Sequence, residues 1–165
     1  MNKQEILNEI EKTKEHLTNM EKMLGKCEYE RRKPKAYEKY WYIDSSGLVN
    51  STCFLDEDIV DAIKLKTYNY FPTKEQTEQE AEKILVRRML EDIAKRLNRG
   101  EKIDWNNGNQ NKYFICFNHW QDIIILEHGW KNKFCGVIYC LDKNFLDIAI
   151  QEIGKERLKA YLRGE

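Results

Sequence analysis

The sequence predicts an α+β protein: an amphipathic, coiled-coil-like helix at the N-terminus, followed by two βββα repeats that share an antiparallel sheet. Apolar residues near the N-terminus recur at heptad spacing, as in a coiled coil. After residue 40, the order strand, strand, connection, strand, helix occurs twice, in residues 40–100 and in 104–162. One such unit covers a sheet face weakly, whereas two paired units share a core, so we assign one α+β domain to residues 40–165.

The N-terminal helix is expected within residues 1–25. Its apolar seam is spaced by four and three residues in turn, and comprises Ile6, Ile10, Thr13, Leu17, Met20 and Leu24. Gly25 suits the position just after a helix end. Two interpretations stay open: the helix packs on its own domain, or it forms a homodimer or binds a partner.

Residues 26–39 are a predicted basic linker, with one proline and six basic against three acidic residues. Its basic patch stands beside tyrosines and comprises Arg31, Arg32, Lys33 and Lys35. Basic and aromatic side chains together suit the phosphates and bases of a nucleic acid. The alternative is a solvated linker whose acidic residues weaken the patch.

The first unit begins with a predicted β-hairpin over residues 40–54. Asp44 suits the start of its turn, and Gly47 suits the left-handed position. A third strand is predicted at 67–71, "TYNYF". Thr73 and Gln76 then form a capping-box pattern that starts a long helix.

The second unit repeats this order. Its predicted strands are rich in aromatic and β-branched residues, and lie at 111–117, 122–128 and 135–140. Asp142 is the predicted N-cap of a helix through Ile153. Gly154 separates that helix from a terminal helix at 155–162. Tyr70 and Tyr139 precede the two predicted caps at the same offset, which supports a duplication.

The composition excludes several classes of protein. The chain has 28 basic and 28 acidic residues, so it has no net charge to attract nucleic acid or a membrane, or to mimic nucleic acid. The longest aliphatic run, Ile123 to Leu126, is too short to span a bilayer. Five cysteines without a CxxC motif fit reduced thiols in a cytoplasm.

Four segments carry a resemblance: "KYWYIDSSGLV", "NYFPTKEQTEQEAEKI", "DWNNGNQNKYFI" and "AIQEIGKERLKAYL". Over residues 38–162 they resemble a widespread group of small proteins from phages and prophages of Gram-positive bacteria. The resemblance implies a phage protein that acts in the cytoplasm of a bacterial host. Small phage proteins of this kind include inhibitors of host defence, such as anti-CRISPR proteins. The expected function is therefore inhibition of a bacterial host protein, for example a CRISPR-type nuclease complex.

No recognised catalytic motif is present, so we expect a binding protein without enzymatic activity or cofactor. "DWNNGNQNKYFI" lacks the ligands of a calcium-binding EF-hand loop. Five potential zinc ligands match no standard spacing and are Cys116, His119, His128, Cys135 and Cys140. We therefore predict no metal site.

Three tryptophans fall in predicted loops of the second half: Trp105, Trp120 and Trp130. Tryptophan is costly to leave in water and is enriched at interaction hot spots. We predict a partner-binding face from these three residues with Asn107 and Asn109. The alternative is that each tryptophan folds over a sheet edge. The rival functions are a nucleic-acid-binding accessory protein, a sponge for a signalling nucleotide and an assembly factor.

Overall fold

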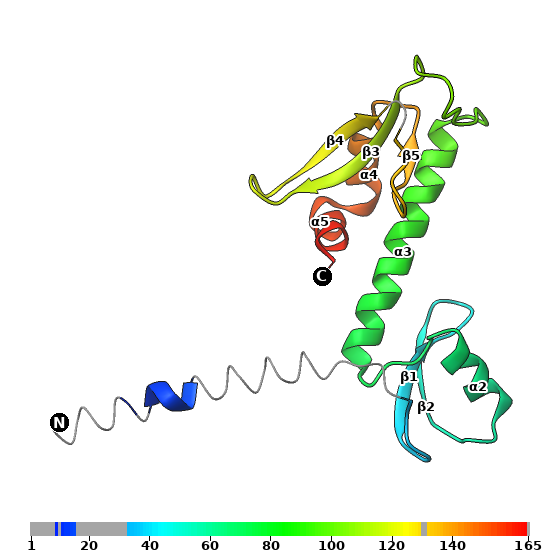
Figure 1. Ribbon diagram of the computed structural model, residues 1–165, viewed down its shortest axis with the longest axis vertical. Helices are drawn as coiled ribbons and strands as arrows, with labels where there is room; N and C mark the ends of the chain where they lie inside the picture. The colour runs from blue at the N-terminus through cyan, green and yellow to red at the C-terminus, as the bar shows by residue number, and fades with distance from the viewer. Residues whose placement is uncertain (1–8, 10, 16–32, 130–131, 165) are drawn as a thin grey trace.

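The computed structural model describes residues 9, 11–15, 33–129 and 132–164, and it shows an α+β protein with helices and two small antiparallel sheets (Figure 1). The elements are β1 (Lys39–Ile43), β2 (Val49–Cys53), α2 (Ile59–Lys66), α3 (Lys74–Leu97), β3 (Lys112–Asn118), β4 (Ile123–Gly129), β5 (Tyr139–Cys140), α4 (Phe145–Ile153) and α5 (Lys155–Arg163). No helix in this described part is both long and apolar enough to cross a bilayer.

The long helix α3 carries a lobe at each end (Figure 1). The first lobe holds β1, β2 and α2, and the second holds the sheet of order β4-β3-β5 with α4 and α5. Within the described residues the strands form two separate sheets, so the prediction of one shared sheet is wrong. The reason is the length of α3, whose 24 residues rise about 36 Å and hold the two units apart.

The β1–β2 hairpin and its turn are confirmed. Asp44 Oδ1 accepts hydrogen bonds from the backbone N–H of Ser46 at 2.9 Å and of Leu48 at 3.0 Å. Gly47 has φ of 89°, the left-handed conformation that glycine adopts without steric cost. The strands then pair from Ile43↔Val49 to Lys39↔Cys53.

The predicted third strand at 67–71 is wrong except at its last residue. Helix α2 ends with Thr67 as its C-cap, and Tyr68 follows with φ of 56°. The backbone N–H of Asn69 then bonds to the carbonyl oxygen of Lys64. This helix end takes up the residues expected in the strand, and only Phe71 pairs with β1, opposite Trp41.

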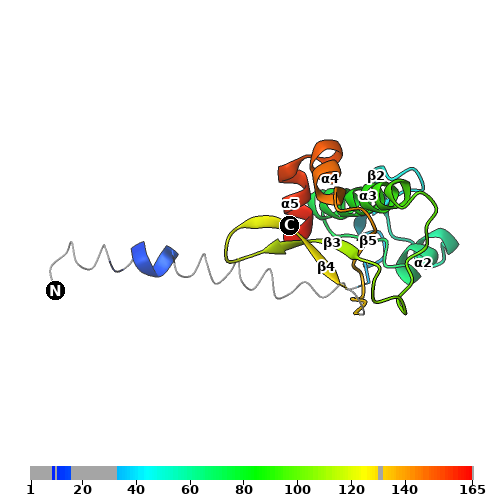
Figure 2. The ribbon, with the colours of Figure 1, turned by 90° about the horizontal axis from the view of Figure 1, so that it is seen from above.

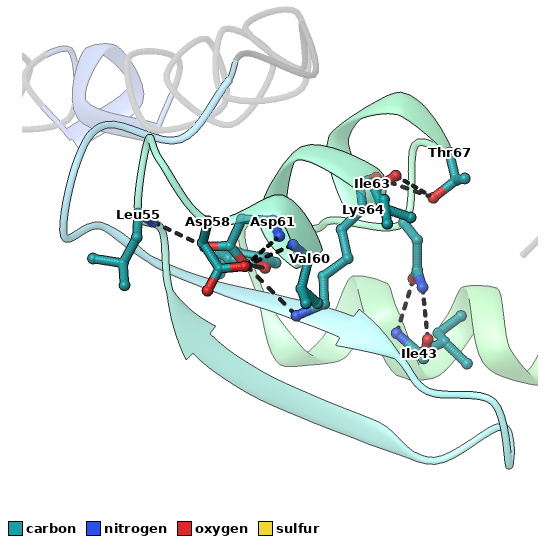
Figure 3. A network of polar contacts seen from close by, with 10 residues as sticks. Ile43, Leu55, Asp58, Val60, Asp61, Ile63, Lys64 and Thr67 are labelled. Carbon is teal, nitrogen blue, oxygen red and sulfur yellow. Dashed lines mark hydrogen bonds and ion pairs between the residues drawn. The ribbon is translucent and has the colours of Figure 1, made fainter.

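A buried polar network attaches α2 to the hairpin (Figure 3). Asp61 is 4% exposed and accepts hydrogen bonds from the Tyr40 hydroxyl and, at 2.8 Å, from Leu55 N–H. Lys64 Nζ lies 3.7 Å from Asp61 Oδ1 and 3.6 Å from the centre of the Tyr42 ring. Burial alone would raise the Asp61 pKa, but these partners outweigh it and hold the pKa below its ordinary value.

Helix α3 begins as predicted. Thr73 Oγ1 accepts a hydrogen bond from the backbone N–H of Gln76, and the helix runs to Leu97, with Asn98 as C-cap. Its inner face contributes Val86, Leu90 and Ile93 to the core of the second lobe.

The second hairpin is confirmed as β3 paired with β4, from Lys112↔Gly129 to Asn118↔Ile123. The strand expected at 135–140 pairs only at Tyr139 and Cys140. The N-cap of α4 is Asn144 and not the predicted Asp142. Asp142 instead accepts a hydrogen bond from Asn144 N–H at 2.8 Å, two residues before the N-cap position.

Near the N-terminus, Glu9 and residues 11–15 are helical, and Thr13 Oγ1 donates to the Glu9 carbonyl oxygen at 2.7 Å. The other predicted seam residues, and the coiled coil itself, lie outside the described residues.

Candidate functional site

Among the described elements, helices cover one face of the three-stranded sheet and none lies on the other, which we call the open face (Figure 2). Side chains along β3 alternate between these faces. Ile115 belongs to the core that also contains α4 and α5 residues, so Phe114 and Cys116 lie on the opposite side. This open face is the candidate interaction surface.

An aromatic cluster lies at one end of the open face. It comprises Trp105, Phe114, Phe134 and Tyr139. The rings of Trp105 and Tyr139 meet edge to face, with centroids 4.9 Å apart. Phe114 lies 5.4 Å from Tyr139 and 6.1 Å from Phe134, which is 53% exposed. The half-buried Trp105 therefore covers part of the sheet and extends an aromatic surface beyond it.

The asparagine-rich loop before β3 is built around a buried lysine. Lys112 is 0% exposed, and its Nζ donates to the carbonyl oxygens of Asn107 at 3.0 Å and Gln110 at 2.8 Å. Asn107 Oδ1 accepts from the backbone N–H of Asn109 at 2.9 Å. Both asparagines are exposed, but the carboxamide of Asn107 helps to shape the loop.

Trp120 stands at the tip of the β3–β4 hairpin and is 98% exposed. Asn118 Oδ1 accepts hydrogen bonds from the backbone N–H groups of Trp120 at 3.0 Å and Gln121 at 3.2 Å. This turn fixes the main chain at the tip and leaves the indole in water.

Helix α5 holds the same tip from the side. Asp122 pairs with Lys159 Nζ at 2.6 Å and with Arg163. The hydrogen bond from Lys159, with the nearby Arg163 charge, lowers the Asp122 pKa below its ordinary value. Lys159 and Arg163 also lie over the Phe117 ring. Hydrogen bonds from the backbone to Asn118 and ion pairs from α5 to Asp122 thus hold the tip in place.

The predicted tryptophans do not form one patch. Trp105 contacts the β5 end of the sheet, whereas Trp120 follows the far end of β3. Trp130 lies outside the described residues. Sequence reasoning missed Phe114 and Phe134, although the alternation along β3 already placed Phe114 on the face opposite Ile115.

In the described half of the basic patch, the side chain of Lys33 has an acidic partner, because its Nζ pairs with Asp56 at 2.7 Å. The backbone N–H of Lys35 bonds to the Glu38 carboxylate, and the Lys35 side chain is exposed. Arg31 and Arg32 lie outside the described residues.

Two of the thiols, those of Cys116 and Cys140, do not suit nucleophilic catalysis. Burial, with a smaller contribution from Glu127, raises the Cys116 pKa. Burial also raises the Cys140 pKa, so both thiols are held in the protonated, less reactive form. Among the residues with described positions, no three His, Cys, Asp or Glu side chains gather to hold a metal ion.

Clefts open to solvent on the described surface. One, of about 680 Å³, lies between the β1–β2 turn and α3 and is lined in part by Leu48, Leu85 and Arg88. Another, of about 520 Å³, lies at the C-terminal end of α3 beside Arg99 and Lys143.

Comparison with known proteins gives no match: no family model, no curated protein and no solved structure is significantly similar to this chain.

Proposed function

We propose that this chain is a phage-encoded binding protein that inhibits a bacterial host protein, such as a CRISPR-type defence nuclease complex, in the host cytoplasm. The braced hairpin tip with Trp120 makes the central contact, and the open sheet face makes the surrounding one. The observation that carries the binding role is the 98% exposure of Trp120 on a tip fixed by Asn118 and Asp122.

The energetic argument concerns the exposed indole. A buried tryptophan removes roughly 150–250 Å² from water, which at about 25 cal/mol per Å² corresponds to some 4–6 kcal/mol as an upper limit. A tip that is ordered before binding loses little conformational entropy on association. Trp120 therefore has the properties of a binding hot spot.

The choice of a defence nuclease as target rests on the resemblance to small phage proteins. The neutral net charge and the ion pair of Lys33 with Asp56 favour contact with protein over direct contact with nucleic acid.

The test is a pull-down with the tagged full chain from a Gram-positive host that carries defence systems, with and without nuclease treatment. A stoichiometric host protein that survives nuclease treatment and is lost with Trp120→Ala is the expected result. Tyr37→Ala is the matched control, because Tyr37 is 79% exposed in the other lobe.

Two results would contradict the proposal. Capture that disappears with nuclease treatment indicates a nucleic-acid-binding accessory protein. Capture of no macromolecule, with a nucleotide in the native mass spectrum, indicates a sponge for a signalling nucleotide.

We also propose that the two lobes descend from one duplicated βββα unit. The residue that follows Tyr70 pairs with β1, and the residue that follows Tyr139 pairs with β3. Tyr70 and Tyr139 are each 7% exposed. In both lobes the third segment thus returns antiparallel to the first strand, and a helix follows.

For the N-terminal heptads we propose a coiled coil that pairs with a partner or with a second copy. The support is the seam of residues 6–24 in the sequence.

A further inference from the structure

The strand β4 forms one edge of the second-lobe sheet. In the order β4-β3-β5, and within the described residues, β4 pairs with β3 alone. All seven residues of β4 pair with consecutive residues of β3, without a bulge. The backbone N–H and C=O groups that point away from β3 are therefore arranged to receive another strand.

This edge has few of the usual features that prevent pairing with another chain. Natural edge strands carry charged side chains, especially lysine, or proline, a bulge or short length, and of these β4 has the single carboxylate of Glu127. The sequence of β4, "IIILEHG", has four consecutive aliphatic residues and no lysine, arginine or proline. Ile123 is 43% exposed although it is a large aliphatic residue.

We propose that β4 pairs antiparallel with β4 of a second copy of this chain, about a twofold axis at Leu126. An axis perpendicular to the sheet keeps the open faces of both copies on one side, so odd-numbered residues meet odd-numbered ones. Ile125 of each copy then lies opposite Glu127 of the other, and Ile124 lies opposite His128. No two like charges face each other, and all seven residues of the strand are paired.

The proposed dimer involves the core as well as the edge of the sheet. Ile124 and Leu126 already pack against the core under the helices. In the dimer Leu126 meets Leu126 of the second copy, and Ile124 meets His128 across the new strand pair. The sheets of the two copies become one continuous sheet, and each copy loses its unprotected edge. This assembly goes beyond the proposed inhibition and does not depend on the identity of the target.

The first measurement is sedimentation equilibrium of the full chain over a range of concentrations. A dimer is expected, and a monomer at all concentrations would overturn the proposal.

Charge variants at Ile125 then test the register. Ile125→Glu places a carboxylate opposite Glu127 of the second copy, whereas the matched Ile125→Lys places an ammonium there. Because each dimer contains this pair twice, we expect the glutamate variant to dissociate about tenfold more readily than the lysine variant. Ile125→Glu combined with Glu127→Lys should restore the dimer. Equal effects of the two single variants would overturn the register about Leu126.

The N-terminal seam is the competing route to a dimer. Leu17→Glu disrupts that seam and should leave the dimer intact. Loss of the dimer in Leu17→Glu, with the dimer retained in the β4 variants, would overturn the proposal.

Amide exchange in the unmodified protein gives a measurement without any variant. Protection of residues 123–129 should increase with protein concentration, and exchange independent of concentration would refute pairing through β4.

Discussion

At the residue scale, each lobe buries one polar side chain next to its strand pairing. In the first lobe Tyr40 donates to the buried Asp61, and in the second Lys112 donates to two carbonyl oxygens. A buried polar group costs free energy unless it is hydrogen-bonded. Each side chain therefore ties a neighbouring segment to its strand: α2 in one lobe and the asparagine-rich loop in the other.

Replacement of Asp61 tests the attachment of α2 to the first hairpin. Asp61→Ala leaves the Tyr40 hydroxyl and Leu55 N–H without their acceptor, which should lower the free energy of unfolding by about 2–3 kcal/mol. Urea unfolding followed by circular dichroism measures this, and a change within experimental error would contradict it.

The Asp61 carboxylate also predicts a pH dependence. Its folded pKa lies below the ordinary value of 3.8, so its contribution to stability is complete above that pH. The contribution is lost as the pH falls through the lowered folded pKa. The unmodified protein should therefore lose stability more steeply below pH 3.8 than Asp61→Ala, and parallel curves for the two proteins would refute this account.

Replacement of Lys112 by methionine retains an apolar stem and removes the ammonium group. The carbonyl oxygens of Asn107 and Gln110 lose their donor, at a cost of about 1–3 kcal/mol. Amide exchange of residues 104–111 should increase, with β4 as internal reference. Unchanged exchange in the loop would show that it does not depend on Lys112.

The sequence correctly predicted turn and helix-cap residues, because their roles depend on the conformational preferences of their own residue types. The turn with Asp44 and Gly47 and the cap at Thr73 follow from conformations that these residue types favour. The burial of Lys112 could not be predicted, because lysine is almost always exposed and its acceptors come from main-chain carbonyls. Trp120 was predicted as a binding residue, and that role awaits the pull-down.

At the element scale, the ends of helices decide where strands form. The C-terminal cap of α2 takes up residues 67–69, and β-propensity in "TYNYF" is not strong enough to prevent this. Strand propensity depends on packing between strands, so a short aromatic run beside a helix end is ambiguous in sequence. Similarly, only two residues of the strand predicted at 135–140 pair with β3: Tyr139 lies opposite Phe114, and Cys140 lies opposite Tyr113.

Removal of the α3 cap tests the role of a helix start. Thr73→Ala deletes the side-chain oxygen that accepts from Gln76 N–H, and should cost about 1 kcal/mol of stability. Ser45→Ala in the exposed β1–β2 turn is the control, with little expected effect. Thermal unfolding measures both, and equal shifts in the two variants would contradict a capping role.

At the scale of the whole molecule, the two lobes have separate cores. The first has three buried aromatic residues, Tyr40, Phe54 and Tyr70, and the second is the larger core under α4 and α5. The sequence predicted the α+β class and both hairpins, because each depends on local pattern. It did not predict the separation of the sheets, because which strands pair depends on where a long helix places them.

The separate cores predict separate responses to a cavity. Phe54→Ala removes one of the three aromatic residues of the small core and should cost about 3–5 kcal/mol locally. Amide exchange should then increase across residues 39–71 and change little across 112–163. A uniform increase over both ranges would mean that the lobes unfold as one unit.

The uninterrupted α3 sets a rotational phase between the lobes. Each residue of an α-helix turns the chain by about 100° and advances it by about 1.5 Å. One alanine inserted into the middle of α3 would therefore rotate one lobe about the helix axis by about 100° relative to the other, with almost no change in their separation. A target that contacts both lobes would be sensitive to such an insertion, whereas a target that contacts only the Trp120 tip would not. The effect of such an insertion on binding therefore shows whether the bound surface is confined to the second lobe or extends to the first.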